Sequence, residues 1–532
     1  MLLQIFQKIH FDKRISILIF IICFTVFVFT NDGHRYTFDE DLAYQQSYRI
    51  ATWANDPSYI QGESRLFFEY PWLYPVYSHE YNQRVVCQNG ILCSSAFIFH
   101  SVTQVPFIFL NHTFNFILDD TIIWTTEDFI DVHYVWWRNS LDPDSTFLEL
   151  FYGPLFTALS VSVLFIICRS YGISVKNSIL VSFIYGFSTI AWAYSQTSLS
   201  SPVMVFFALL GFHFFKNWKT NDSPRYLIVS GTCFGLAFLT RFDAVLFIIP
   251  VFFFILYLIK AKKEKIKSLL GFIIPTFSAY GIKTLIEYVR GGLTGAEAPG
   301  VDVLNLVAVK HTIPAHEFFE HLFGLFFSPG GGLFIFCPVL IGIFVGFFDF
   351  YKKNKSECIL LLGFVFMFIL QFARGDYWHG FNGWSVRYFV PLIPFLLIPI
   401  AFSLEKRGVF FKLSLVILGA LGFFINLVYL LQDTHWFVWG FFGDDTRGLY
   451  SLARKDDGGV HPIWISPLVI WTFEYSQLTQ SVAWLINKLQ ADLFLLKLLG
   501  IQFYIITLLS LLAIPVYLLR NTLSKLKLDK SL

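Results

Sequence analysis

Charged residues are scarce in this sequence of 532 residues. Asp, Glu, Lys and Arg make up only 14% of the chain, whereas 55% of it is hydrophobic. A water-soluble protein has about a quarter of its residues charged, so the composition excludes an ordinary soluble fold and predicts a membrane protein. The formal net charge of +2 gives no reason to expect a nucleic-acid partner.

The chain also lacks a cysteine framework and any zinc-type pair of CxxC motifs. Five of its seven cysteines fall in or beside apolar runs and are expected to act as small packing residues: Cys23, Cys168, Cys233, Cys337 and Cys358. The other two, Cys87 and Cys93, flank a Gln-Asn-Gly turn in a polar loop. They are candidates for a short disulfide if that loop faces an oxidising compartment.

Long apolar runs recur along the chain, many of them close to the roughly 17 to 25 residues that a helix needs to cross a bilayer. About twelve are present, at 15–30, 147–168, 177–194, 202–215, 226–240, 244–259, 268–286, 332–350, 358–372, 388–404, 413–431 and 499–519. Lys and Arg gather in every second connection, as in the run 260–267, which predicts that these connections and both termini are cytoplasmic. The expected fold class is an all-α polytopic membrane protein.

This topology divides the chain into five parts. They are a cytoplasmic N-terminus with the first span (1–30), a large outer loop (31–146), the transmembrane core (147–431), a second outer loop (432–498) and a last span with a basic cytoplasmic tail (499–532). The first apolar stretch has no small-x-small cleavage site after it and is expected to be a retained anchor. Two aromatic-rich segments of the first outer loop, at 96–110 and 119–137, predict interfacial helices that lie on the membrane.

An acidic triplet, Asp39, Glu40 and Asp41, follows the first span within about ten residues. Partial shielding from water raises the pKa of a carboxylate, which suits it to act as a general base near neutral pH. The alternative is a solvated helix start, in which the acids favour the helix that follows. Both interpretations stay open from the triplet alone.

Two further polar clusters interrupt apolar runs at the predicted outer face. Arg241 and Asp243 lie between two closely spaced runs, where they form either an anion site or a simple ion pair. The second cluster, in the stretch 373–395, holds Arg374, Asp376, His379, Trp384, Arg387 and Tyr388. Arginine binds phosphate through two parallel hydrogen bonds, and aromatic faces stack on sugars, so this cluster suits a lipid-linked phosphosugar or forms a routine aromatic belt.

A histidine-rich stretch at 311–321 does not predict a metal site. Its sequence HEFFEH spaces two histidines at i and i+5, whereas the H-E-x-x-H zinc motif places them at i and i+4 on one helical face.

Taken together, three motifs resemble the GT-C class of integral membrane glycosyltransferases, which includes protein O-mannosyltransferases and aminoarabinose transferases. They are the acidic motif after the first span (FDEDLAY), the junction GLAFLTR with a later Pro, and SVRYFVPLIPF at the start of a late span. The resemblance implies transfer of a hexose or pentose, with inversion, from a polyprenyl-phosphate donor to a glycan, lipid or protein hydroxyl. It places the active face outside, in a prokaryotic plasma membrane.

The resemblance also assigns roles to residues. Asp39 or Glu40 would be the base, and Arg241 and Arg387 would bind the donor phosphate as it leaves. Asp41 and Asp243, with the second cluster, would contact the substrate, and the 432–498 loop would contribute to acceptor binding. No cofactor or metal is required by this chemistry, although some relatives use a divalent cation.

Two other classes share part of this pattern. A transporter or flippase also has about twelve spans, but it keeps short loops, inverted repeats and polar residues at mid-membrane. This chain has long outer loops and no detectable repeat, and its charges gather at one face. An oligosaccharide ligase or polymerase, with paired Arg and His in a late outer loop, stays open as an alternative.

Overall fold

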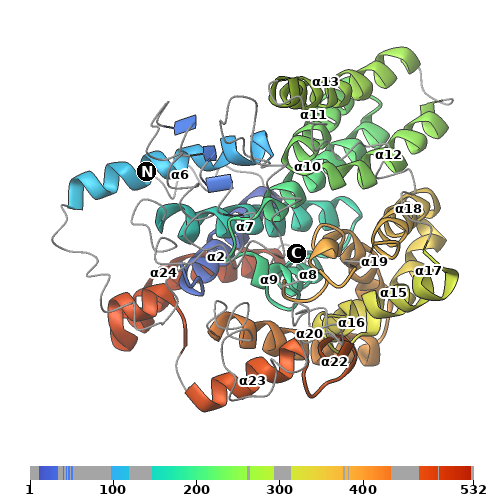
Figure 1. Ribbon diagram of the computed structural model, residues 1–532. Helices are drawn as coiled ribbons and strands as arrows, with labels where there is room; N and C mark the ends of the chain where they lie inside the picture. The colour runs from blue at the N-terminus through green and yellow to red at the C-terminus, as the bar shows by residue number, and fades with distance from the viewer. Residues whose placement is uncertain are drawn as a thin grey trace.

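The structure is a computed structural model, and it describes residues 11–33, 40, 43–44, 46–47, 50–51, 97–118, 146–259, 264–292, 313–375, 378–380, 383–432, 467–488 and 491–528. Within these residues the chain is all-helical, without a β-strand. The expected all-α class is therefore confirmed for the part of the chain that is described. Figure 1 shows the arrangement of the helices.

The helices follow the predicted apolar runs closely. The α-helices are α2 (Phe11–Phe29), α6 (Ile98–Leu118), α7 (Thr146–Ser170), α8 (Val175–Phe187), α9 (Ala191–Tyr194), α10 (Ser200–Asn221), α11 (Pro224–Thr240), α12 (Val245–Leu258), α13 (Lys265–Gly292), α15 (Ala315–Phe327), α16 (Leu333–Phe336), α17 (Ile343–Lys353), α18 (Lys355–Phe372), α19 (Ile393–Lys406), α20 (Val409–Leu431), α22 (Pro467–Trp471), α23 (Gln477–Lys488) and α24 (Phe494–Leu528). Three 3₁₀ turns join them: η4 (Phe242–Ala244), η6 (Pro338–Gly342) and η7 (Arg387–Phe389).

Five helices of the described chain are long and apolar enough to cross a membrane. They are Phe147–Ser170, Lys265–Ile286, Lys355–Phe372, Val409–Leu431 and Phe494–Ser524. An 18-residue helix is about 27 Å long, close to the thickness of the hydrocarbon core. The total of about twelve spans stays a prediction, because several other apolar helices are shorter than this length.

Two predicted runs are divided into separate helices in their interior. The run 332–350 divides into α16, the 3₁₀ turn η6 and α17, because Pro338 has no N–H to continue an α-helix. The run 177–194 divides where α8 ends at Phe187, and the short helix α9 resumes at Ala191. This second interruption matters for the site, because it brings Tyr194 and the polar residues that follow it into the interior.

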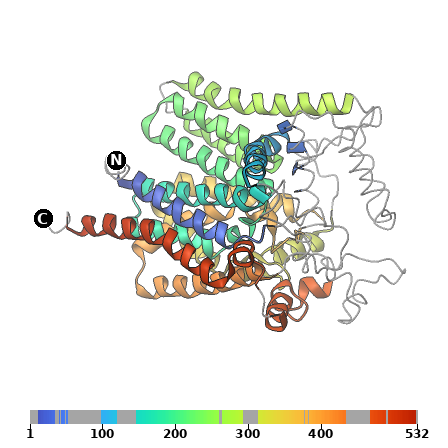
Figure 2. The ribbon, with the colours of Figure 1, turned by 90° about the vertical axis from the view of Figure 1, so that its left-hand side faces the viewer.

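The helices α2, α7 and α24 lie side by side and run lengthwise through the bundle (Figure 2). Ser16 Oγ donates to Ser162 O at 3.3 Å and Ser162 Oγ donates to Ser16 O at 3.0 Å, which ties α2 to α7. Tyr504 Oη donates to Phe29 O at 2.7 Å and ties α24 to the end of α2. The Phe11 end of α2 and the Leu528 end of α24 consequently lie at the same side of the bundle (Figure 2).

A second group of helices, α10, α11 and α13, forms one edge of the molecule (Figure 1). The helices approach closely at Gly231, where a Cβ atom would lie 2.6 Å from the Phe272 carbonyl oxygen. Ser230 Oγ also donates to Gly211 O at 2.8 Å and joins α11 to α10. This packing fixes the end of α11, which carries Arg241.

The helix α6 runs crosswise to α2 and α7 (Figures 1 and 2). It includes the first of the two segments predicted to be interfacial, and it contains Pro106. The crosswise direction agrees with a helix that lies on the membrane, although the interfacial placement itself stays a prediction. The second segment, 119–137, lies outside the described residues.

Candidate active site

Eight of the predicted site residues fall within the described structure. They are Glu40, Arg241, Asp243, Arg374, His379, Trp384, Arg387 and Tyr388. The predicted site residues Asp39, Asp41 and Asp376 lie outside it, as do both members of the candidate disulfide, Cys87 and Cys93.

Glu40 is fully buried against the polar turn SQTSLSS, which joins α9 to α10. The backbone N–H of Ser198 donates to Glu40 Oε1 at 3.0 Å. This turn lies directly on α7, because a Cβ atom on Gly153 would lie 2.3 Å from Thr197 O and 2.4 Å from Ser195 O. Glu40 is thus held by the interior of the bundle, which distinguishes it from a solvated residue at a helix start.

Arg241 and Asp243 form an ion pair at the end of α11. Arg241 leaves the helix in an extended conformation, and its Nε and Nη2 both donate to Asp243 Oδ2, at 2.9 and 2.6 Å. Its Nη1 donates to Ser201 Oγ at 3.3 Å. A guanidinium carries five N–H groups, so these three bonds leave two donors for an anion. The ion pair and an anion site are therefore compatible.

Tyr194 is a buried residue close to several of the predicted site residues. Its hydroxyl is within electrostatic range of Arg387, Arg241 and Glu40. The same hydroxyl donates to the carbonyl oxygen of Trp384 at 3.1 Å. The phenol is buried and lies beside the loop that carries Arg387, and the sequence pattern had not identified Tyr194.

The loop that carries Arg387 is shaped by close contacts. A Cβ atom on Gly383 would lie 2.6 Å from Tyr194 Oη and 2.9 Å from Arg387 Cδ, so a glycine is needed for these two side chains to approach. Ser385 adopts φ 59°, a left-handed conformation that costs a non-glycine residue about 1 kcal/mol or more. Its Oγ donates to Gly331 O at 2.7 Å, which stabilises this conformation.

The aromatic residues of this loop mainly pack against protein. The Trp384 ring is 1% exposed, lies 4.8 Å from the Tyr429 ring and meets Phe336 edge-on at 4.9 Å. Tyr388 stacks on Phe372 with a centroid distance of 4.8 Å, and the Arg387 guanidinium lies 5.4 Å from the Tyr388 ring. The cation–π contact orients Arg387 beside the cluster.

His379 is a buried residue of the same loop region as Arg387. Burial, together with the nearby charges of His321 and Arg387, lowers the pKa of His379 to about 4. His321 itself stacks on Trp378, and its Nδ1 is 3.0 Å from Ala373 O. Arg374 is half-buried after the end of α18, and its guanidinium makes no hydrogen bond within the described residues.

The helix α6 contributes a polar network that the sequence interpretation missed. Gln104 Nε2 donates to Ser198 O at 3.0 Å, on the turn that also holds Glu40, and His100 Nδ1 lies 2.9 Å from Tyr152 Oη. Burial, together with the charge of Arg241, lowers the pKa of His100 to about 3. The i and i+4 spacing of His100 and Gln104 in an apolar segment was the available signal, because it places both on one helical face.

One part of the chain is similar to a known protein family. Residues 144–280 match the family described as dolichyl-phosphate-mannose-protein mannosyltransferase. The resemblance to the GT-C class is confirmed over these residues. Among curated proteins, no significant match to the chain was found. Together with the apolar helices, the match supports an integral membrane protein with similarity to glycosyltransferases.

The matched stretch covers part of the site. It includes α7 to α11 with Tyr194, Ser198, Arg241 and Asp243, whereas Glu40 and Arg387 lie outside it. The structure thus joins the matched GT-C-like region to charges from the beginning and the later part of the chain. Within the described residues no group of three or more His, Cys, Asp or Glu side chains is arranged to hold a metal ion.

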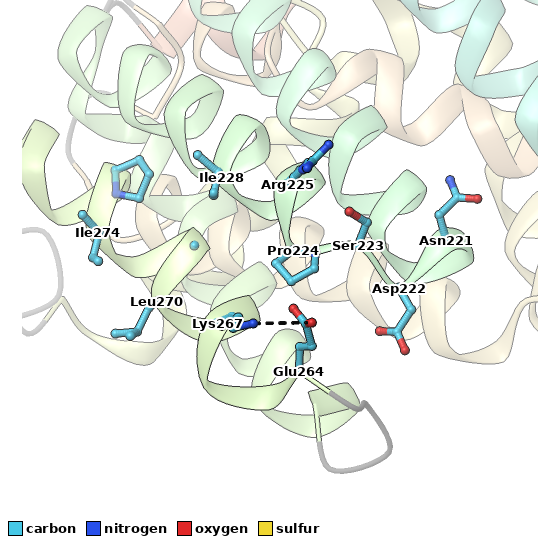
Figure 3. A pocket seen from close by; sticks show the side chains of 12 residues that line it. Asn221, Asp222, Ser223, Pro224, Arg225, Ile228, Glu264, Lys267, Leu270 and Ile274 are labelled. Carbon is cyan, nitrogen blue, oxygen red and sulfur yellow. Dashed lines mark ion pairs between the residues drawn. The ribbon is translucent and has the colours of Figure 1, made fainter.

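A cavity of about 1030 Å³ lies away from this cluster, between the start of α11 and α13 (Figure 3). Its lining includes Arg225, Ile228 and Lys267, and Lys267 Nζ is 3.6 Å from Glu264 Oε1. Arg241 follows the other end of α11, a 17-residue helix that is about 25 Å long. The cavity is therefore not the space around Tyr194.

Proposed function

We propose that the protein is a GT-C-type membrane glycosyltransferase that transfers a sugar from a polyprenyl-phosphate donor to an acceptor hydroxyl at the outer face of the membrane. The observation that carries this proposal is that Glu40, Arg241 and Arg387 all lie against the stretch 194–201 or its neighbours. Ser198 N–H donates to Glu40, Arg241 donates to Ser201 Oγ, and Gly383 lies close to both Tyr194 Oη and Arg387 Cδ. One buried carboxylate and two half-buried guanidinium groups provide a proton acceptor beside a site for an anion. The family match over residues 144–280 supports the same class of donor.

The reaction needs few chemical groups. Glu40, or Asp39 beside it in sequence, takes the proton from the acceptor hydroxyl as its oxygen attacks the anomeric carbon. The bond between that carbon and the phosphate oxygen breaks, and its electron pair leaves with the phosphate. Attack from the face opposite the phosphate inverts the anomeric configuration. The lipid tail stays in the bilayer, so the reaction takes place at the headgroup plane.

The two arginines are suited to hold the leaving phosphate. Arg241 keeps two N–H donors after its bonds to Asp243 and Ser201. Arg387 belongs to the loop that lies against Tyr194, and with Arg241 it gives two cations to stabilise the negative charge that grows on the phosphate. Positioning and charge stabilisation of this kind reduce the barrier without a cofactor.

The buried turn beside Glu40 offers a place for the acceptor. Ser198 donates its backbone N–H to Glu40, while its own hydroxyl is buried and makes no hydrogen bond within the described residues. An incoming acceptor hydroxyl could pair with this Oγ and with the carboxylate at the same time. The Asp39 and Asp41 carboxylates remain candidates for the same proton transfer and for acceptor contacts.

The test is sugar transfer in proteoliposomes, with a panel of labelled polyprenyl-phosphate sugars and acceptor hydroxyl compounds. Glu40→Gln keeps an oxygen that accepts from Ser198 but cannot take a proton. We expect its turnover to fall by about 10²- to 10⁴-fold with little change in donor KM. Glu405→Gln is the matched control, because Glu405 accepts hydrogen bonds from Ser174 and Asn177 far along α19 from η7.

Two results would contradict the proposal. Wild-type turnover in both Glu40→Gln and Asp39→Asn would remove the assignment of the base. Flux of an ion or solute without any glycoside product would place the protein with the transporters.

A further inference from the structure

Gln477, the first residue of α23, makes two hydrogen bonds to the loop that carries Arg387. Its Nε2 donates to Gly383 O at 3.0 Å, and its Oε1 accepts from Ser385 N at 3.1 Å. The side chain is 4% exposed, and it joins residues more than 90 positions apart in sequence. A single carboxamide thus binds the backbone on both sides of Trp384.

The backbone that Gln477 binds, at Gly383 and Ser385, lies just before Arg387 in the sequence. Ser385 is held in its left-handed conformation by Gly331 as well, and Val386 N donates to Gly331 O at 3.1 Å. The N–H of Arg387 donates to Ser385 O at 2.9 Å, and Arg387 is the first residue of η7. The direction in which Arg387 leaves the backbone therefore depends on the conformation that Gln477 fixes two residues earlier.

The segment that carries Gln477 is itself anchored. Gly330 N donates to Ile470 O at 2.9 Å, which joins the glycine turn before α16 to α22. The ring of Trp471, also on α22, lies 5.8 Å from that of Trp378, and α23 packs against α20 (Figure 1). The segment α22–α23 belongs to the 432–498 region, for which the resemblance to GT-C enzymes implies a part in acceptor binding.

We propose that Gln477 is a positioning residue for the donor-phosphate site, and that it couples the α22–α23 segment to Arg387. This inference rests on the proposed function, in which Arg387 binds the phosphate. Gln477 does not touch the substrate; it acts by fixing Gly383 and Ser385, and through them the origin of the Arg387 side chain. Movement of the α22–α23 segment is thereby transmitted to Arg387, which holds the donor phosphate.

The test compares Gln477→Ala and Gln477→Glu with Gln480→Ala. Gln480 is a matched control, because it lies one turn along the same helix and its Nε2 donates within its own segment, to Glu474 O at 2.8 Å. We expect Gln477→Ala to raise donor KM about tenfold, with a smaller change in kcat, because a lost pair of hydrogen bonds frees the loop. Gln480→Ala should leave both constants near wild type.

Gln477→Glu gives a signature that a merely structural residue would not. A carboxylate still accepts from Ser385 N but cannot donate to Gly383 O, whereas a protonated carboxyl can do both. Relative to wild type, the donor KM of this variant should therefore recover as the pH falls from about 7.5 to about 5, towards the pKa of a glutamic acid. If the ratio of the variant's donor KM to that of wild type does not change with pH, Gln477 does not hold the loop through both hydrogen bonds.

Amide hydrogen exchange separates this inference from the proposed function. Gln477→Ala should speed exchange at Ser385 and Val386, and Gln480→Ala should not, whether or not the protein transfers a sugar. Equal exchange in the two variants, or equal donor KM in an active protein, overturns the role of Gln477. If wild type transfers no sugar but Gln477→Ala still exchanges faster than Gln480→Ala, the proposed function is overturned. The two hydrogen bonds of Gln477 to the loop are then still supported.

Discussion

Arg241 donates two hydrogen bonds to a single oxygen of Asp243, from Nε at 2.9 Å and from Nη2 at 2.6 Å. The carboxylate side chain is only 4% exposed, so water cannot replace it as a partner. Asp243 therefore orients the Arg241 guanidinium and does not face solvent. Arg241 presents its remaining donors in a direction that the pair has fixed.

Replacement of this carboxylate by an amide tests that relationship. Asp243→Asn removes the charge that orients Arg241, and hydrogen bonds to charged groups contribute about 1.5 to 3 kcal/mol. We expect donor KM to rise by about tenfold or more, measured by sugar transfer at varied donor concentration. The matched control is Asp349→Asn, which breaks an equivalent pair with Arg407 at 2.6 Å beyond the far end of α19. An equal rise in KM for both variants would contradict the assignment.

Arg387→Lys tests the shape of the second phosphate ligand. Lysine keeps the positive charge but loses the planar pair of donors that matches a phosphate. We expect donor KM to rise about tenfold for Arg387→Lys and further for Arg387→Gln, which also loses the charge. Binding of a sugar-free polyprenyl phosphate, followed by quenching of tryptophan fluorescence, should weaken in the same order. Equal binding by all three proteins would exclude Arg387 from the phosphate site.

The neutral, buried His379 predicts how stability depends on pH. Burial lowers its pKa to about 4 in the folded protein, whereas an unfolded histidine titrates near about 6.5. Between these values the unfolded chain binds more protons, so stability is lost as the pH falls through this window, by up to about 3 kcal/mol. His379→Gln should reduce the fall in apparent Tm between about pH 7 and about pH 5.

The control for this pH effect is His316→Gln, which changes an exposed histidine on α15. It should leave the pH dependence of the apparent Tm as in wild type. His100, whose pKa is lowered to about 3, adds a contribution of the same sign. A residual slope is therefore expected in His379→Gln, and an unchanged slope would contradict the role of His379.

Gly153→Ala tests the contact beneath the turn that holds Glu40. The added methyl would lie 2.3 Å from Thr197 O and 2.4 Å from Ser195 O, and backbone atoms cannot move aside cheaply. Overpacking of this kind costs about 1 to 3 kcal/mol, so we expect a lower apparent Tm and a lower turnover. Gly281→Ala is the control, because nothing lies within 4 Å of its added Cβ. Equal apparent Tm values would disprove the close contact.

The helices could be predicted largely from local sequence, and the exceptions have local causes. Apolar runs such as 202–215 and 268–286 fall inside α10 and α13, because their residues have a consistent preference for an apolar environment. The run 332–350 was predicted as one span, but Pro338 interrupts it. The break after α8 has no proline, and there Ile190 N donates to Cys337 Sγ at 3.3 Å, a tertiary contact that the local sequence does not predict.

The site was only partly predictable. The sequence singled out Glu40, Arg241 and Arg387 because charge beside an apolar run is costly unless it has a role. It could not identify Tyr194 or Gln477, because a tyrosine and a glutamine near a span are common and carry no distinctive spacing. Trp384 was predicted to contact substrate, and the structure places its ring between Phe336 and Tyr429.

The sequence by itself determined the helical membrane class and the residues at which charge interrupts apolar runs. Both follow from the hydrophobicity of consecutive residues, which can be read from one sequence. Only the tertiary structure decided that Glu40 lies against Ser198 and that Tyr194 lies beside the loop that carries Arg387. These relationships depend on how distant helices pack, and no local pattern encodes the distance between segments more than 100 residues apart.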